Sequence, residues 1–457
     1  MYGRIRRIHL VGIGGSGMCG IAEVLVNLGY DISGSDTKES EVVARLRTLG
    51  ATIASKHDAA NVENAEVVVA STAIAESNPE IRRAHERGIP VIPRAEMLAE
   101  LMRIKYSVAV AGAHGKTTTT SMVGEILAHG GLDPTVIVGG RLKAIGANAR
   151  LGQGPFLVAE ADESDGSFLF LSPTIAVITN VDEEHLDYYG SVERIIEAFA
   201  TFVNRVPFYG TIVLPADEPN AASLRTMAKR RVITYSLGGE TDVEGRDLVV
   251  GANGVSFNLR IRGRDEGAIE MKVTGVHNAR NALAAIAAGW ELGVPITAMR
   301  DALRDFAGVG RRLEARGTLL GALWIDDYAH HPTEIAAAVA ALRATHGRRI
   351  VAVFQPHRFT RTMALLDRFA GCFAGVAELV LLPIYAAGEK PIPGVTADIL
   401  AERVTKSGGT RVHRAADHAA AAEAVRGLLG EDDIFLTIGA GDVYRVGELA
   451  RTKEQAA

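Results

Sequence analysis

Short apolar runs alternate with helical patterns in the first part of the chain. Residues 8–13 predict a strand, residues 18–28 predict a helix after a glycine-rich loop, and residues 67–70 (VVVA) predict another strand. A short extended segment follows at residues 89–93. This alternation of strands and helices is typical of βαβ units that build a parallel sheet.

The pattern then begins again twice, each time with a strand, a loop and a helix. The restarts place domain boundaries near residues 105 and 312. The middle segment has predicted strands at 107–111, 156–160 and 175–179, a hairpin pattern at 247–262 around Asn253-Gly254, and helices at 117–128, 278–292 and 296–306. The last has strands at 323–326, 349–354, 379–382 and 434–438 and a helix at 333–345. We therefore expect an α/β protein with domains at 1–105, 106–312 and 313–457.

Composition agrees with this architecture and excludes several classes of protein. At roughly 150 residues per domain, the 457 residues predict about three domains. The net charge of −5 is too small to indicate nucleic acid or an anionic membrane surface as a partner. No uninterrupted apolar run approaches the ~18 residues of a membrane span. Cys19 and Cys372 are too few for a disulfide framework and are expected to be small buried side chains, so we expect a soluble cytoplasmic protein.

Residues 12–17 (GIGGSG) lie between the first predicted strand and helix and fit the G-x-G-x-x-G pattern. Glycines here let the turn close and let a pyrophosphate approach the backbone at the helix N-terminus. Asp36 comes 19 residues after Gly17, where an acidic side chain can bind ribose hydroxyls. Taken alone, the loop indicates a nucleotide diphosphate such as NAD, and a tight turn without a ligand is the alternative.

Residues 112–118 (GAHGKTT) form a second glycine loop between a strand and a helix. Its backbone N–H groups can hold phosphates, the Lys116 ammonium can reach the β- and γ-phosphates, and the Thr117 hydroxyl can bind Mg²⁺. The standard P-loop has a glycine at the position of Val110, so this is a shortened variant. The alternative is an exposed lysine in a turn, with His114 as a polar loop residue.

Two acidic clusters, residues 160–164 (EADES) and 180–187 (NVDEEHLD), each follow a predicted strand. Both therefore lie at the carboxyl ends of strands, the edge at which open α/β sheets bind ligands. Glu160 and His185 are candidates for two Mg²⁺ sites, because Mg²⁺ takes one or two protein ligands beside phosphate oxygens and water. Imidazole is an unusual ligand for Mg²⁺. The alternative is that His185 contacts a metal ligand without binding the metal, or has a structural role only.

The remaining polar candidates lie at a helix start, at the second boundary and after strands of the last segment: Asn278, Asn281, Arg312, Asp327, His330, Arg358 and Arg361. The two asparagines are interpreted either as helix caps or as ligands of an adenine edge. The two arginines after the strand at 349–354 can clamp an anion or form a solvated charge pair. Arg312, at the boundary, is interpreted equally well as a solvated linker residue.

The order of these motifs along the whole chain resembles the Mur ligase family. Any one motif is weak, but the ordered set is specific, and it includes residues 71–74 (STAI), 94–98 (RAEML), 277–281 (HNARN), 308–312 (GVGRR) and 385–389 (YAAGE). The resemblance implies an N-terminal Rossmann-like domain that binds the UDP-sugar, a central P-loop-type domain that binds ATP, and a C-terminal Rossmann-like domain that binds the amino acid.

The same resemblance implies the chemistry of a cytoplasmic enzyme of peptidoglycan precursor synthesis. The substrates would be UDP-N-acetylmuramate, L-alanine and ATP, with two Mg²⁺ ions as cofactors. The lactyl carboxylate would attack the ATP γ-phosphate, and the alanine amine would then attack the acyl phosphate. We expect a monomer or a weak homodimer.

Each candidate residue takes a role by resemblance. Catalysis would use Lys116, Glu160, His185 and His330. ATP would bind at Gly112, Ala113, His114, Gly115, Lys116, Thr117, Thr118, Asn278, Asn281, Arg312 and Asp327, and Mg²⁺ at Thr117, Glu160 and His185. The UDP-sugar and the amino acid would bind at Gly14, Gly15, Ser16, Gly17, Asp36, Ser71, Thr72, His330, Arg358 and Arg361.

One departure from the family pattern concerns the second metal. Several family members carry a carbamylated lysine shortly after the histidine of the second acidic cluster. No lysine lies between His185 and Lys229 here, which leaves open what replaces the carbamate.

Three alternative functions stand beside this reading. They are a ligase that adds a preformed tripeptide to the same sugar, an NAD-dependent oxidoreductase, and a catalytically silent nucleotide-binding regulator. The second phosphate loop argues against the oxidoreductase, which has no use for it. The intact Lys116, Glu160 and His185 argue against the silent regulator.

Overall fold

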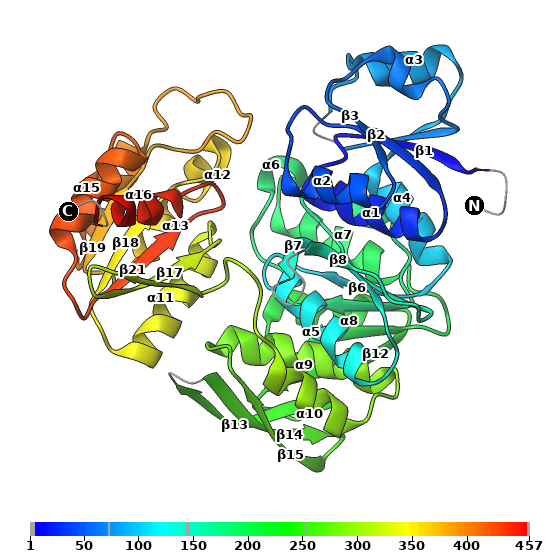
Figure 1. Ribbon diagram of the computed structural model, residues 1–457. Coiled ribbons are helices and arrows are strands. Elements are labelled where there is room, and N and C mark those ends of the chain that lie inside the picture. Colours follow the sequence, from blue (N-terminus) through cyan, green and yellow to red (C-terminus); the bar gives the residue numbers. More distant parts are fainter. Residues whose placement is uncertain (1–4, 72–73, 143–146, 252–253, 455–457) are drawn as a thin grey trace. The chain divides into compact units, whose positions relative to one another are not determined.

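The computed structural model describes residues 5–71, 74–142, 147–251 and 254–454, which form three β-sheets with helices packed against them (Figure 1). The predicted α/β class with three domains is confirmed. Several strands have the predicted bounds, because their apolar runs are short and sharply limited: β4 (Val67–Ala70), β9 (Phe156–Glu160) and β21 (Ile434–Ile438).

The first sheet has five parallel strands in the order β3-β2-β1-β4-β5. Its elements are β1 (Arg7–Val11), α1 (Ser16–Asn27), β2 (Asp31–Ser35), α2 (Glu41–Thr48), β3 (Thr52–Ala54), η1 (Ala59–Val62), β4, α3 (Pro79–Glu86), β5 (Val91–Pro93) and α4 (Arg94–Arg103). The strand order reverses between β1 and β4, which is where open α/β sheets bind ligands. The first glycine loop follows β1 and Ser71 follows β4, so both lie at this reversal.

The second sheet has ten strands in the order β15-β14-β13-β12-β11-β10-β6-β9-β7-β8. Its strands are β6 (Tyr106–Ala111), β7 (Thr135–Leu142), β8 (Ala147–Arg150), β9, β10 (Ile175–Ile178), β11 (Thr211–Pro215), β12 (Arg231–Leu237), β13 (Val243–Gly251), β14 (Gly254–Ile261) and β15 (Arg264–Met271). Its helices are α5 (Lys116–His129), η2 (Ser167–Phe170), α6 (Leu186–Tyr189), α7 (Val192–Val203), α8 (Pro219–Met227), α9 (Val276–Glu291) and α10 (Ile296–Asp305). The predicted turn at Asn253 lies outside the described residues.

The position of β6 explains why the candidate residues of this domain gather. β6 pairs in parallel with β9 on one side and with β10 on the other. The loops after these three strands carry the second glycine loop and both acidic clusters. Parallel neighbours end at the same edge, so three segments that are far apart in the sequence meet there.

The third sheet has the order β16-β17-β21-β18-β19-β20, antiparallel only between β16 and β17. Its elements are β16 (Glu314–Leu319), β17 (Ala322–Asp327), α11 (Pro332–His346), β18 (Ile350–Phe354), α12 (Phe359–Ala364), α13 (Leu366–Gly371), β19 (Glu378–Leu381), α14 (Ala397–Ser407), β20 (Arg411–Arg414), α15 (His418–Leu428), β21 and α16 (Arg445–Glu454). The loops after β17 and β18 carry the polar candidates of the last segment.

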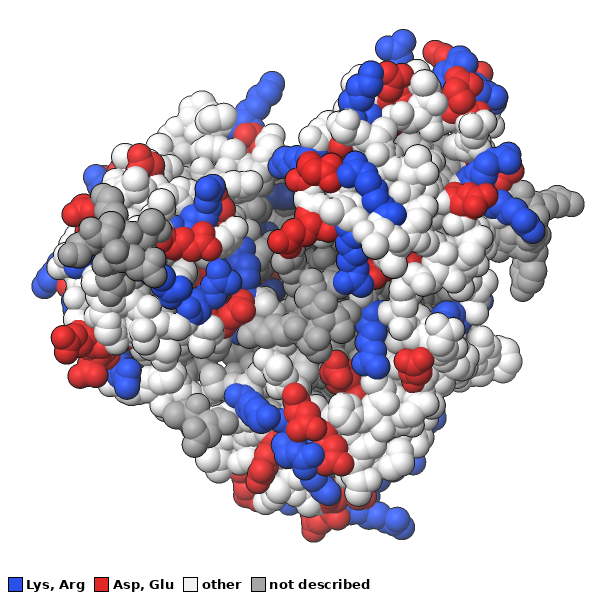
Figure 2. Space-filling model, in the orientation of Figure 1, with Lys and Arg blue, Asp and Glu red and all other residues white. Residues whose placement is uncertain are grey.

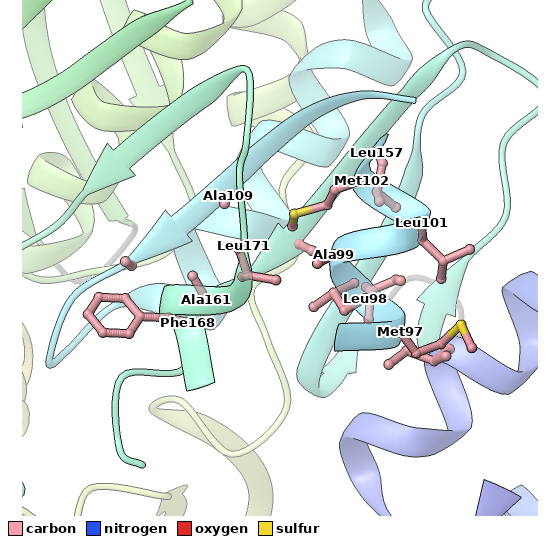
Figure 3. Close-up of a cluster of buried hydrophobic side chains, with 14 of the residues drawn as sticks. Met97, Leu98, Ala99, Leu101, Met102, Ala109, Leu157, Ala161, Phe168 and Leu171 are labelled. Carbon is pink, nitrogen blue, oxygen red and sulfur yellow. The ribbon is translucent and has the colours of Figure 1, made fainter. Parts of the chain in front are cut away.

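The first two sheets share one hydrophobic core through helix α4. Its side chains Met97, Leu98 and Met102 belong to the same buried cluster as Leu157 and Phe168 of the second sheet's domain (Figure 3). Burial of one such side chain contributes roughly 1.5–3 kcal/mol, so the two domains stabilise each other. By internal contacts the chain divides into two compact units, and most of the second consists of residues 310–457.

The helices, the surface charge and the two cysteines can be compared with what the sequence predicts. No helix in the described part of the chain combines the length and the apolar composition needed to cross a bilayer. Basic and acidic side chains are intermixed over the face shown in Figure 2. Cys19 and Cys372 are buried and carry no disulfide, as predicted.

Candidate active site

The glycines of the second loop have a backbone shape that other residues rarely adopt. Gly112 has a φ of +141° and Gly115 a φ of +81°. A Cβ on Gly112 would collide with Thr179 Oγ1, and one on Gly115 would lie 2.6 Å from Asn281 Oδ1. The loop is therefore pressed against the end of β10 and against helix α9, and only glycine fits at both contacts.

His114 fixes the loop to the segment that follows β10. Its backbone N–H donates to Asn180 Oδ1 at 2.9 Å, and its carbonyl accepts from Thr179 Oγ1 at 2.6 Å and from Asn180 Nδ2 at 3.0 Å. Its ring Nε2 lies 3.0 Å from Asp182 Oδ2. The side chain of His114 thus points at the second acidic cluster, and it positions the loop.

Lys116 is turned back into its own loop. Its Nζ donates to the carbonyls of Gly112 at 2.6 Å and Ala113 at 3.1 Å, and to Glu163 Oε1 at 2.9 Å. Burial by itself lowers the pKa of Lys116, but the charges of Glu163 and nearby acids outweigh it and raise that pKa. Lys116 is therefore a fixed positive charge at the edge where the three loops meet.

Glu163 is the most deeply buried acid of this edge, at 2% exposure. Burial raises its pKa most, Lys116 lowers it, and Asp162 and Glu184 raise it further, to about 7. Its Oε2 is buried and has no hydrogen-bond partner. The Glu163, Glu184 and His185 donor atoms all lie within 4.8 Å of one another.

The sequence pointed to Glu160 and His185, and the structure places both at this edge. Glu160 ends β9 beside Val110 of β6, and His185, with a φ of +57°, directly precedes α6. Sequence reasoning missed Glu163 and Glu184, although both lie in the two acidic clusters. Their position in the two acidic clusters indicated that they could lie near the site. Nothing in the spacing distinguished them from the other acidic residues of these clusters.

The two asparagines lie one turn apart inside α9. The helix begins at Val276, so Asn278 is its third residue and neither asparagine is its N-cap. Asn281 Nδ2 donates to Asn278 Oδ1 at 3.3 Å. Asn281 also lies against Gly115, so its amide stands beside the second glycine loop.

In the first domain, the Asp36 carboxylate accepts a hydrogen bond from the first glycine loop. Its Oδ2 accepts from the Gly14 N–H at 2.9 Å, and its Oδ1 accepts from the Lys38 N–H at 2.9 Å. Gly15 is the N-cap of α1 and Ser16 its first residue. Asp36 therefore holds the first glycine loop through a direct hydrogen bond. Thr72 lies outside the described residues.

In the second compact unit, the Asp327 carboxylate connects the segment before β16 to the loop after β17. Its Oδ2 accepts from the Leu313 N–H and its Oδ1 from the Ala329 N–H, both at 2.7 Å. Burial raises the pKa of Asp327, and Arg312 and these two N–H groups lower it, which leaves it at about 6. Arg312 Nη1 lies 3.4 Å from Glu334 Oε1, so Arg312 belongs to a charge network and is not a solvated linker residue.

The segment after β18 carries a histidine that sequence reasoning did not select. His357 stacks on the Tyr385 ring at 5.4 Å and meets the His330 ring edge-on at 5.8 Å. Burial, His330, Arg361 and Arg358 lower the pKa of His357 to about 3, so its ring is neutral. Its only sequence signal was a place within residues 354–361.

Glu389 holds the helix that carries Arg361. Its carboxylate accepts from the N–H groups of Phe359 at 2.7 Å and Thr360 at 3.1 Å, and from the Thr360 hydroxyl at 2.6 Å. This caps the N-terminus of α12 and explains the 385–389 motif structurally. Arg358 directly precedes α12, with a φ of +70°, and Arg361 lies within the helix.

Sequence models of three Mur ligase domains match the chain. They are the catalytic domain of the family at residues 7–106, the middle domain at 110–289 and the glutamate ligase domain at 311–441. Together with the three sheets and a glycine loop between acidic strand ends, these matches define the class. The chain belongs to the Mur ligase family.

Similar proteins include full-length relatives and solved structures. The UDP-N-acetylmuramate--L-alanine ligase of Geobacter sp. (strain M21) is 52% identical over 100% of this chain and 99% of its own. The relative of the same name from Geobacter sulfurreducens is 50% identical over 99% of both chains. The structure of the UDP-N-acetylmuramate-alanine ligase MurC from Thermotoga maritima has a TM-score of 0.82 at 29% identity, covering 98% of this chain and 99% of its own. A murein peptide ligase from Psychrobacter arcticus shares the fold, with a TM-score of 0.72 at 24% identity over 98% of both chains.

Proposed function

We propose that this chain joins L-alanine to the lactyl carboxylate of UDP-N-acetylmuramate, with conversion of ATP to ADP and phosphate, in peptidoglycan precursor synthesis. The observation that carries the proposal is the 52% identity, over the whole chain, to a ligase of that name. The phosphate loop beside two acidic strand ends is the arrangement that this chemistry needs. An acid–amino-acid ligase of this family uses ATP because a carboxylate has no good leaving group.

The proposed reaction has two steps. A lactyl carboxylate oxygen attacks the γ-phosphorus of ATP, the bond from that phosphorus to the β,γ-bridging oxygen breaks, and ADP leaves. The alanine amine then attacks the acyl carbon, and phosphate leaves as the amide forms and the amine loses a proton. Since the carboxylate and the triphosphate repel each other, the protein must supply orientation and positive charge.

The residues of the first compact unit fit these demands. Lys116 binds the phosphates and stabilises the charge of the transferring group, and Asn278 and Asn281 bind adenine beside the loop. Thr117, Glu160 and His185 would hold Mg²⁺, which supplies charge neutralisation to the triphosphate when bound. The buried, partnerless Oε2 of Glu163 supports a cation at this edge, because such an oxygen calls for a positive partner.

The other assignments rest on the resemblance. We assign Gly14–Gly17, Asp36 and Ser71–Thr72 to the UDP-sugar, Arg312 and Asp327 to ATP, and His330, Arg358 and Arg361 to the carboxylate and the amino acid. We also propose domains at 1–105, 106–312 and 313–457. The two buried, unbridged cysteines are consistent with the reducing cytoplasm that we propose as its location.

Phosphate release from ATP tests the function directly. We expect release only with UDP-N-acetylmuramate and an amino acid together, and faster with L-alanine than with glycine, L-serine or the preformed tripeptide. Tripeptide-dependent release without alanine-dependent release would overturn the assignment in favour of a tripeptide ligase. A change in NADH absorbance in the same assay would instead indicate an oxidoreductase.

We expect Gly112→Ala to weaken ADP binding at least about tenfold, because the new Cβ collides with Thr179 and the φ of +141° is strained for alanine. Isothermal titration calorimetry with ADP measures the change. Gly427→Ala is the matched control, since Gly427 lies on helix α15 with nothing within 4 Å of its added Cβ. Equal ADP affinities for Gly112→Ala and the parent would contradict the placement of the phosphate loop.

A further inference from the structure

We propose that Ser35 is a positioning residue for the first glycine loop, because its carbonyl group holds the loop while the buried Glu80 carboxylate holds its hydroxyl group. This connection from Glu80 through Ser35 to the loop is argued from contacts within the first domain. Its consequence for UDP-sugar affinity rests on the proposed function, which assigns the loop to the UDP-sugar.

The end of strand β2 holds three consecutive N–H groups of the first glycine loop. The Ser35 carbonyl accepts from the N–H groups of Gly12 at 2.9 Å and Ile13 at 3.1 Å. The Asp36 carboxylate accepts from the next one, that of Gly14, at 2.9 Å. Because backbone N–H groups away from water need an acceptor, the path of the loop after β1 depends on where Ser35 and Asp36 lie.

The Ser35 side chain is fixed by groups from two other segments. Ser35 is fully buried, and its hydroxyl donates to Glu80 Oε2 at 2.7 Å. His57 Nδ1 lies 2.9 Å from Ser35 Oγ and 2.8 Å from Glu80 Oε2. Since the single hydroxyl proton of Ser35 is given to Glu80, the His57 ring donates from Nδ1. Helix α3 and the segment before η1 thus both anchor Ser35.

Glu80 is a strong anchor because it is ionised. Burial raises the pKa of Glu80, but hydrogen bonds from its neighbours outweigh burial and lower that pKa to about 2. Its other oxygen, Oε1, is bound as well, by Asn61 and His9. The hydrogen bond from Ser35 is therefore charge-assisted, and such a bond is stronger than one between neutral groups.

Ser33 shares this polar network but does not reach the loop. It lies two residues earlier on β2, on the same face of the strand, and its Oγ lies 2.9 Å from His9 Nδ1. In the pairing of β1 with β2, Ser33 stands opposite His9, whereas Ser35 stands opposite Val11, the last residue before the loop. Ser33 is therefore a matched control for Ser35.

Amide hydrogen exchange of the full chain without ligand, followed by mass spectrometry, tests the connection. We expect Ser35→Ala to speed the exchange of residues 12–14 by about tenfold, since it removes one charge-assisted hydrogen bond from the anchor of the loop. Ser33→Ala should leave this exchange at the parental rate. Exchange of residues 12–14 that is equal in Ser35→Ala and Ser33→Ala would overturn the proposal.

Glu80→Gln provides a second variant, because it keeps the size of the side chain and removes the charge that holds Ser35. It should also speed the exchange of the loop. Thermal melting by circular dichroism shows whether each variant is folded, and Glu80→Gln decides if Ser35→Ala is not.

Calorimetric titration with UDP tests the consequence for binding. We expect Ser35→Ala to weaken UDP binding by about tenfold and to leave ADP binding unchanged, because the second glycine loop belongs to a different sheet. In the ligase assay the KM for the UDP-sugar should rise while kcat stays at the parental value, and Ser33→Ala should change neither. An unchanged UDP affinity in a Ser35→Ala variant whose loop exchanges faster would overturn this consequence. A parent chain that binds no UDP would overturn the proposed function, while the exchange experiment would still decide the connection from Glu80 to the loop.

Discussion

Replacing Lys116 by alanine is expected to slow alanine-dependent phosphate release by roughly a thousandfold or more. The reason is that Lys116 is the fixed cation of the second glycine loop, at the edge shared by β6, β9 and β10. The affinity for UDP-N-acetylmuramate should change little, because the first glycine loop belongs to a different sheet. Phosphate release and calorimetric titration with the UDP-sugar measure the two effects.

The buried partner of Lys116 requires a control. Removal of the lysine leaves Glu163 buried without its cation, and this alone can disturb the site. The double variant Lys116→Ala/Glu163→Gln removes both charges. Activity that stays low in a stably folded double variant, while Glu163→Gln alone keeps its activity, assigns the loss to Lys116 itself. Turnover of ATP by Lys116→Ala at the parental rate would refute the phosphate-loop assignment.

Much of the fold could be predicted from local signals. The strands β4, β9 and β21 have the predicted bounds because their apolar runs end abruptly at polar or turn residues. Both glycine loops lie between a strand and a helix, as their sequences indicated. Such features depend on patterns within a few neighbouring residues, and these patterns can be recognised in the sequence alone.

The arrangement of the site depended on contacts between distant segments. Glu163 is one of seven acidic residues in the two clusters, and the spacing along the sequence does not single it out. Only the placement of β6 between β9 and β10 brings it to Lys116. Asp36 matched the position of a ribose ligand, but local backbone N–H groups occupy both of its oxygens. Asn278 has the appearance of a cap in the sequence, yet α9 begins two residues earlier.

A buried polar network in the first domain leads to the second large prediction. Glu80 is fully buried, and its Oε1 lies 2.6 Å from Asn61 Nδ2 and 3.3 Å from His9 Nε2. Its Oε2 accepts from Ser35 Oγ at 2.7 Å and lies 2.8 Å from His57 Nδ1. One carboxylate thus ties helix α3 to strands β1 and β2 and to the segment before η1.

Glu80→Ala is expected to lower the free energy of unfolding by about 3–5 kcal/mol, because it leaves several buried polar groups without their shared partner. Urea unfolding followed by circular dichroism measures the change. Glu86→Gln is the control on the same helix, since Glu86 forms an exposed pair with Arg83 and should change the free energy by less than about 1 kcal/mol. A loss for Glu80→Ala no larger than that of the control would contradict the role of the network.

The same carboxylate makes the stability of this domain depend on pH. Burial alone would raise the pKa of Glu80, but its hydrogen bonds outweigh burial and lower that pKa from 4.5 to about 2. A folded-state pKa below the unfolded value means that the ionised form stabilises the fold above about pH 4.5 and that this stabilisation is lost as the pH falls toward about 2. The difference in unfolding free energy between the parent and Glu80→Gln should therefore shrink between about pH 6 and pH 3. A difference that stays constant over this range would show that the charge of Glu80 contributes nothing.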